Sequence, residues 1–142
     1  MRTFFKTIFL CALMYMPQSH AFDNILGQWT TVDDKTGQKR AVVELFMKDN
    51  LLNGKIIKVY RQKGDTGLCQ KCNPPFKNKP IEGLEFMWGL KSDGNGNWIG
   101  GQILDAKTGK IYNAKLTLKG DKLYVRGYVG FALLGRTQVW AR

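Results

Sequence analysis

Two cysteines spaced as Cys-x-x-Cys are the residues of this sequence with the clearest chemical potential. Cys69 and Cys72 lie in a turn-rich stretch beside Gly67, Asn73 and Pro74. A redox pair normally has its first cysteine at the start of a helix, and a zinc site needs further cysteine or histidine ligands, which are lacking here. We therefore expect a local disulfide, formed in an oxidising compartment, with thiol-disulfide catalysis as the alternative.

Other catalytic chemistry finds little support in the residue types. His20 is the only histidine among the 142 residues, and it lies in a segment that we expect to be removed. The mature chain then has no histidine for a Ser-His-Asp triad or an ordinary catalytic zinc site. Most of its carboxylates lie in predicted turns, where turn formation already explains them. We expect a protein that is not an enzyme, with no catalytic residue, metal ligand or cofactor.

The first 21 residues have the pattern of a cleavable secretory signal. Arg2 and Lys6 give a positive start, residues 7–16 are mostly apolar, and residues 19–21 read Ser-His-Ala, a small-x-small cleavage site. Cleavage near Ala21 leaves residues 22–142 as one predicted domain, in the periplasm or outside the cell. No later stretch is long and apolar enough to predict a transmembrane segment.

The mature chain is strongly basic. Without Arg2 and Lys6, 20 of the 22 basic residues remain against 11 acidic ones, which gives a net charge of +9. Positive charge is densest around one long predicted loop, which carries Lys63, Lys71, Lys77 and Lys79. These lysines indicate either a solvated surface or contact with an anionic component of the envelope. Nucleic acid is not expected, because secretion removes the usual target and no recognition motif is evident.

Short runs of strand-forming residues alternate with turn clusters along the mature chain. The turns are rich in Asp, Asn and Gly, which favours tight hairpins over crossovers. The predicted strands are residues 27–32, 40–47, 51–60, 84–90, 97–104, 110–117, 122–129 and 136–141. This pattern predicts an all-β fold, an eight-stranded antiparallel up-and-down β-barrel, with a long loop near residues 61–83.

Alternating apolar residues predict which side chains face the interior of the barrel. Leu84, Phe86, Trp88 and Leu90 share one face of their strand, and Tyr112 lies on the apolar face of another. The interior of such a barrel is either filled by side chains or holds one small ligand. In the second case Phe86, Trp88 and Tyr112 are candidate ligand contacts.

Arg126 has two readings, which depend on the register of its strand. If Leu123 and Val125 point inward, Arg126 lies outside with Tyr124 and Tyr128, and this is the orientation we favour. In the reversed register Arg126 is a buried cation that needs a partner. That orientation makes it a candidate for binding a ligand carboxylate.

The two ends of the mature chain carry an aromatic residue and a cation that suit barrel closure. Trp29 lies in the first predicted strand, and Arg142 follows the last. A guanidinium over an indole face stabilises by about 1 kcal/mol. We expect Trp29 to pack against Arg142, in preference to Arg136, and to seal one end of the core.

Several stretches in order resemble one family, the secreted bacterial proteins known as domain of unknown function 2147 (DUF2147). The matching stretches are residues 27–34, 69–72, 80–84, 100–105, 108–112, 123–128 and 135–142. The resemblance implies a lipocalin-like (calycin) barrel, in agreement with the strand count. It transfers no ligand and no catalytic residue to this sequence.

Two functions follow as hypotheses. The first is a periplasmic or secreted lipocalin-like protein that binds a small, mainly apolar or lipid-like ligand in the barrel. The second is a non-enzymatic envelope protein with a filled barrel, whose basic loop contacts anionic glycan, lipid or protein. The volume of the interior distinguishes the two hypotheses, because a ligand site needs a cavity of about 300 Å³ or more.

Overall fold

The computed structural model describes residue 15, residues 25–130 and residues 135–142, so nearly all of the predicted signal segment lies outside the described residues. Its strands are β1 (Gly27–Val32), β2 (Lys39–Lys48), β3 (Leu51–Val59), β4 (Glu85–Ser92), β5 (Asn97–Leu104), β6 (Ile111–Lys119), β7 (Lys122–Tyr128) and β8 (Gly135–Trp140). Every predicted strand is present, with ends that differ by at most two residues. Within the described ranges, no helix is long and apolar enough to cross a membrane.

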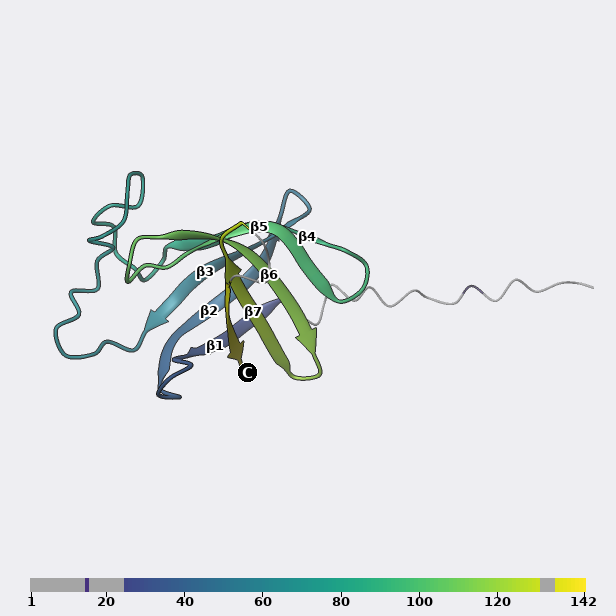
Figure 1. The fold of residues 1–142 in the computed structure, drawn as a ribbon, viewed down its shortest axis with the longest axis horizontal. Helices are drawn as coiled ribbons and strands as arrows, with labels where there is room; N and C mark the ends of the chain where they lie inside the picture. Colours follow the sequence, from purple (N-terminus) through teal and green to yellow (C-terminus); the bar gives the residue numbers. More distant parts are fainter. Residues whose placement is uncertain (1–14, 16–24, 131–134) are drawn as a thin grey trace, which may run out of the picture.

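The strands form one sheet in sequence order, and each strand pairs antiparallel with the next. Figure 1 shows this sheet curling round, so that the C-terminal end of the chain returns beside β1. The predicted up-and-down barrel is confirmed as a nearly closed barrel.

Aspartate side chains hold the short turns that make this meander. Oδ1 of Asp33 accepts hydrogen bonds from the backbone N–H groups of Thr36 and Lys35, each at 2.9 Å, and these bonds lower the pKa of Asp33. Asp93 and Asp105 accept equivalent bonds from the residues two positions further on, at 2.7 and 2.9 Å. Such local bonds satisfy the turn backbone without a longer connection.

One end of the barrel is filled by large apolar side chains. The largest fully buried members of this core include Trp29, Leu45, Leu52, Leu90, Leu116 and Leu123. They lie on the inward faces of their strands, towards the turns that join β2 to β3, β4 to β5 and β6 to β7. This end of the molecule is therefore a packed core.

The first and last strands meet at a short seam. The N–H of Thr30 donates to the carbonyl of Ala141 at 2.7 Å, and the N–H of Ala141 donates back at 3.2 Å. The guanidinium of Arg142 lies 4.1 Å from the ring centroid of Trp29 and donates to the carbonyl of Leu26 at 3.2 Å. The predicted contact between Trp29 and Arg142 is thus present, at the filled end of the barrel.

Arg136 contacts a different partner on the same seam. Its guanidinium makes an ion pair with Asp34 in the turn after β1 and donates two side-chain hydrogen bonds to that carboxylate. The bonds from Arg136 hold the pKa of Asp34 below its ordinary value. The two arginines therefore join the last strand to the first at opposite ends of the barrel.

The prediction that Trp88 shares the inward face of Phe86 is wrong. The register between β3 and β4 shifts twice, and Gly89 has a φ of +77°, so the alternation along β4 is interrupted. Phe86 and Met87 are consecutive and both are buried, whereas Trp88 is half-buried and stacks on Phe76 with the ring centroids 5.8 Å apart. An irregularity of this kind re-aims a side chain to the other face of the sheet.

We predict that Trp29→Ala destabilises the barrel by about 3–5 kcal/mol, the range for truncation of a buried large aromatic residue. Trp29 is 1% exposed, and its Nε1–H also donates to the carbonyl of Ile25 at 2.9 Å. Thermal unfolding checks this, with Trp88→Ala as the control, because that variant removes a half-buried indole from outside the barrel. An unfolding midpoint of Trp29→Ala within about one degree of the wild type would contradict the closure.

Candidate functional site

The end of the barrel opposite the packed core contains a cavity of about 840 Å³. All eight strands contribute side chains to its wall, in chain order Thr31, Val43, Ile56, Phe86, Leu104, Tyr112, Val125 and Gln138. These residues occupy inward positions because side chains alternate between the two faces of a strand. The sequence left open whether the interior is filled, and the structure combines a filled end with an open one.

One wall of the cavity is apolar. Val43, Ile56 and Phe86 come from the neighbouring strands β2, β3 and β4, and all three are buried. The ring of Trp140 lies with its centroid 6.1 Å from that of Phe86 and also borders the cavity. An apolar molecule in this space would replace water along a continuous hydrocarbon and aromatic surface, which is favourable.

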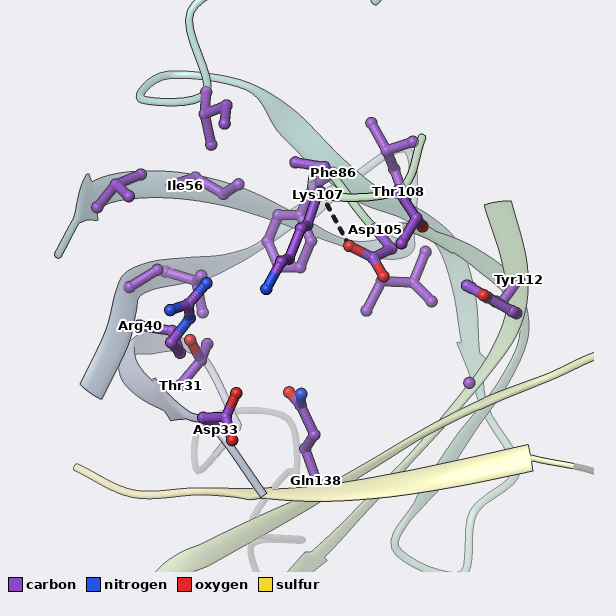
Figure 2. Close-up of a pocket in the computed structure, with 18 of the residues that line it drawn as sticks. Thr31, Asp33, Arg40, Ile56, Phe86, Asp105, Lys107, Thr108, Tyr112 and Gln138 are labelled. Carbon is purple, nitrogen blue, oxygen red and sulfur yellow. Dashed lines mark hydrogen bonds between the residues drawn. The ribbon is translucent and has the colours of Figure 1, made fainter. Parts of the chain in front are cut away.

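The wall near the seam is polar. Thr31 from β1 and Gln138 from β8 border the cavity, and Figure 2 shows both side chains on the seam side of the space, across from Ile56 and Phe86. Oε1 of Gln138 accepts a hydrogen bond from Nε1–H of Trp140 at 3.1 Å, which orients its amide. This wall offers a few placed polar groups opposite an apolar surface, as in many small-molecule sites.

The rim of the cavity carries charged side chains. Arg40 stands at the start of β2, and Lys107 lies in the turn between β5 and β6. Figure 2 shows the guanidinium of Arg40 and the ammonium of Lys107 reaching into the cavity from these two elements. Neither side chain takes part in an ion pair within the described ranges. Asp33 and Asp105 lie near them, and both carboxylates accept backbone hydrogen bonds.

The long connection between β3 and β4 forms part of the rim. The predicted disulfide between Cys69 and Cys72 is confirmed, and the two residues are 0% and 3% exposed. The N–H of Cys69 donates to the carbonyl of Lys79 at 2.8 Å, and Leu68 pairs with Pro80 in a short bridge. The loop thus folds on itself and has buried contacts of its own.

Two contacts fix this loop against neighbouring turns. Nε2 of Gln62 donates to Oε1 of Gln38, before β2, at 2.9 Å. On the other side, Gly109 in the turn before β6 approaches the backbone of Lys71 so closely that a Cβ placed there would lie 1.9 Å from the Lys71 carbonyl oxygen. The loop is therefore part of the cavity wall, together with the turn between β1 and β2 and the turn between β5 and β6.

The sequence-predicted ligand contacts divide into two groups. Phe86 and Tyr112 border the cavity, whereas Trp88 lies outside it. Arg126 also lies on the outer face, where its Nη1 donates to Oγ1 of Thr137 at 3.0 Å. The favoured orientation of this strand is the one observed, because Val125 is 4% exposed and borders the cavity. The inward reading of Arg126, and with it a role in binding a ligand carboxylate, is wrong.

The four lysines predicted to meet an anionic partner are all exposed. Lys71 borders the cavity, while Lys63, Lys77 and Lys79 lie elsewhere on the loop. Sequence reasoning missed Arg40, Lys107 and Gln138 as cavity residues. Side chains alternate between the two faces of a strand, so the inward position of Trp140 could have indicated Gln138. No sequence pattern indicates which turn residues of a barrel border its opening.

Comparisons with known proteins agree with this architecture. A family model described as "Uncharacterized protein conserved in bacteria (DUF2147)" matches residues 27–142, as the resemblance predicted. No curated protein matches the chain. A solved structure described as "Protein HP1028 from the human pathogen Helicobacter pylori belongs to the lipocalin family" is similar with a TM-score of 0.71 and 20% identity, over 82% of this chain and 81% of its own. At this identity the similarity shows the fold alone.

We predict that the disulfide is structural. A Cys69→Ala, Cys72→Ala double variant should stay folded and lose about 2 kcal/mol, the loop-entropy value for a short closed loop. Alanine keeps the buried positions apolar, and limited proteolysis should show faster cleavage between β3 and β4. Denaturant unfolding measures the loss. Rapid wild-type turnover in an insulin-reduction assay, abolished in the variant, would contradict a purely structural role.

Proposed function

Because this chain belongs to the DUF2147 family of bacterial proteins and folds as a lipocalin-like barrel, we propose that it binds a small, mainly apolar molecule inside the barrel. The observation that carries the proposal is the cavity of about 840 Å³ with side chains from all eight strands in its wall. Its volume lies in the range of about 300–1,000 Å³ that is usual for small-molecule sites. The apolar wall of Val43, Ile56 and Phe86 supplies the binding surface.

We further propose that this binding takes place in the bacterial envelope or outside the cell. The support is the secretory pattern of residues 1–21, which ends at Ser-His-Ala. An oxidising compartment also suits the disulfide between Cys69 and Cys72.

We propose binding rather than catalysis as the activity. The acidic residues on the cavity rim are Asp33, Asp65 and Asp105, and each accepts a hydrogen bond from a backbone N–H of its own turn or loop. Carboxylates held in this way have a structural task.

A cavity-filling variant tests the proposal. A Cβ added to Gly127 of β7 would lie 3.5 Å from Cβ of Tyr112, an ordinary contact, so Gly127→Leu extends into the cavity without a backbone clash. We predict that the wild type binds the neutral fluorophore N-phenyl-1-naphthylamine and that Gly127→Leu weakens this binding by about tenfold or more, because the added leucine occupies the space of the probe. Fluorescence titration measures both affinities.

Asn113→Leu is the matched control, since it adds the same side chain at an exposed position of β6. It should bind the probe as the wild type does. Unfolding midpoints of both variants establish that each is folded. Equal probe affinity for folded Gly127→Leu and the wild type, or no binding by the wild type, would contradict an interior site.

The basic loop supports a second candidate, contact with an anionic glycan, lipid or protein of the envelope. Lys63, Lys71, Lys77 and Lys79 are exposed and take part in no ion pair among the residues that the structure describes. The disulfide and the contact with Gly109 constrain the backbone from which these exposed lysines project. A basic surface raises the local concentration of anions.

If the loop contacts anionic lipid, binding to phosphatidylglycerol vesicles should exceed binding to phosphatidylcholine vesicles and should fall with added salt, because exposed charges are screened beyond about 8 Å at physiological ionic strength. Changing all four loop lysines to glutamine should reduce the association rate more than it raises the dissociation rate. The control with the same net charge changes four exposed lysines outside the loop: Lys39, Lys48, Lys91 and Lys122. Equal loss in both variants would assign the effect to net charge and remove the loop as a contact site for lipid.

A further inference from the structure

We propose that the molecule bound in the cavity is a single-chain amphiphile with an anionic head group, whose head is held at the rim by Arg40 and Lys107. This inference rests on the proposed function and assigns a chemical class to the ligand. Its acyl chain would lie on the apolar wall of Val43, Ile56 and Phe86. Its head group, a carboxylate or a phosphate, would meet the two cations that reach into the space.

The charges around the cavity favour an anion. Five basic residues border it against three acidic ones, and because Arg136 is paired with Asp34 outside the wall, four basic residues against three acidic ones leave a difference of +1. The basic residues are Lys35, Arg40, Lys71, Lys107 and Arg136, and the acidic residues are Asp33, Asp65 and Asp105. A concave opening with an excess of one sign concentrates ions of the opposite sign.

The acidic residues on the rim already have partners. Asp33 accepts two backbone hydrogen bonds at 2.9 Å, Asp105 accepts one from the N–H of Lys107 at 2.9 Å, and Asp65 accepts one from the N–H of Gln62 at 2.8 Å. These hydrogen bonds hold the carboxylates in their turns. None of the three carboxylates forms an ion pair with a rim cation in the described part of the chain.

Among the rim cations, Arg136 is neutralised by Asp34, which lies outside the cavity wall. Arg40 and Lys107 form no ion pair in the described ranges, and Arg40 is half-buried. The pKa of Asp33 is lowered mainly by the backbone N–H groups of Thr36 and Lys35, with a smaller effect of the charge of Arg40, so this guanidinium keeps its donors for another acceptor. A guanidinium pairs with a carboxylate or a phosphate through two parallel hydrogen bonds, and an ammonium adds a point charge. These two side chains therefore provide a place for an anionic head group.

The depth of each residue gives the ligand an orientation. Along β2, Arg40 comes at the rim and Val43 lies further in, and along β8 the indole of Trp140 follows Gln138 towards the packed core. Polarity thus falls from the rim to the floor. A chain with one charged end matches this gradient, whereas a wholly apolar molecule offers no hydrogen-bond acceptor to Arg40 and Lys107.

Displacement of N-phenyl-1-naphthylamine by three ten-carbon compounds tests the assignment. The compounds are decanoate, decyl phosphate and decanol, which share a chain and differ in the head group. For the wild type we expect at least one of the two anions to displace the probe about tenfold better than decanol. The reason is that a hydrogen bond between charged groups stabilises a complex by about this factor more than one to a neutral hydroxyl. The relative strengths of decanoate and decyl phosphate distinguish the two head groups.

An Arg40→Gln, Lys107→Gln double variant should lose this preference while its affinity for decanol stays within about twofold of the wild type, because only the head-group contacts are removed. The matched control is Lys39→Gln, Lys110→Gln. It changes two exposed basic residues with the same loss of charge, neither of which borders the cavity. This control should keep the preference.

Three results would overturn the inference: equal displacement by all three compounds, an unchanged preference in the Arg40→Gln, Lys107→Gln variant, or an equal loss in the control. These results leave interior binding itself intact, because the neutral probe reports it separately. If the wild type does not bind the probe and none of the three compounds binds in isothermal titration, the proposed function fails instead.

Discussion

The barrel depends on the seam where its first and last strands meet, because a meander of eight strands otherwise leaves two unpaired edges. Among the described residues, backbone pairing across this seam is limited to Thr30 of β1 and Ala141, directly after β8. Side chains supply the remaining contacts: Arg142 covers Trp29 at the filled end, and Arg136 pairs with Asp34 at the open end. Because Trp29 is also a central part of the packed core, the same side chain closes the seam and fills that end of the barrel.

The inward side chains fill one end of the barrel and leave a space at the other. Leucines and the indole of Trp29 pack together at the filled end, whereas the residues of the other end, from Thr31 and Gly127 to Phe86 and Trp140, line a wall around the cavity. The disulfide loop packs against Gly109 and forms part of the rim around the space that remains. The packed end gives the stability that lets the other end keep a cavity, which by itself is unfavourable.

Most of the architecture could be predicted from sequence because its signals are local. Turn residues and the alternation of apolar with polar side chains predicted the eight strands. The contact of Trp29 with Arg142 could be predicted because an aromatic residue and a cation lie at the two ends of the mature chain. Trp88 was misplaced because the irregularity in β4 interrupts the alternation, and Gly89 inside the strand was the one residue that signalled it. Burial of the cysteines and the positions of Arg40 and Lys107 depend on how loops pack over the opening, which is a tertiary property.

The central claim, that a small apolar ligand lies inside the barrel, is tested most directly by nuclear Overhauser contacts between unlabelled decanoate and protein with labelled Ile and Val methyl groups. A ligand inside the barrel should give contacts from the acyl chain to Val43, Ile56 and Val125, which face the cavity. Such a ligand should give no contact to Ile99 and Val139, which are 40% and 37% exposed and do not border the cavity. Contacts confined to Ile99 and Val139, with none to the interior methyl groups, would contradict binding inside the barrel.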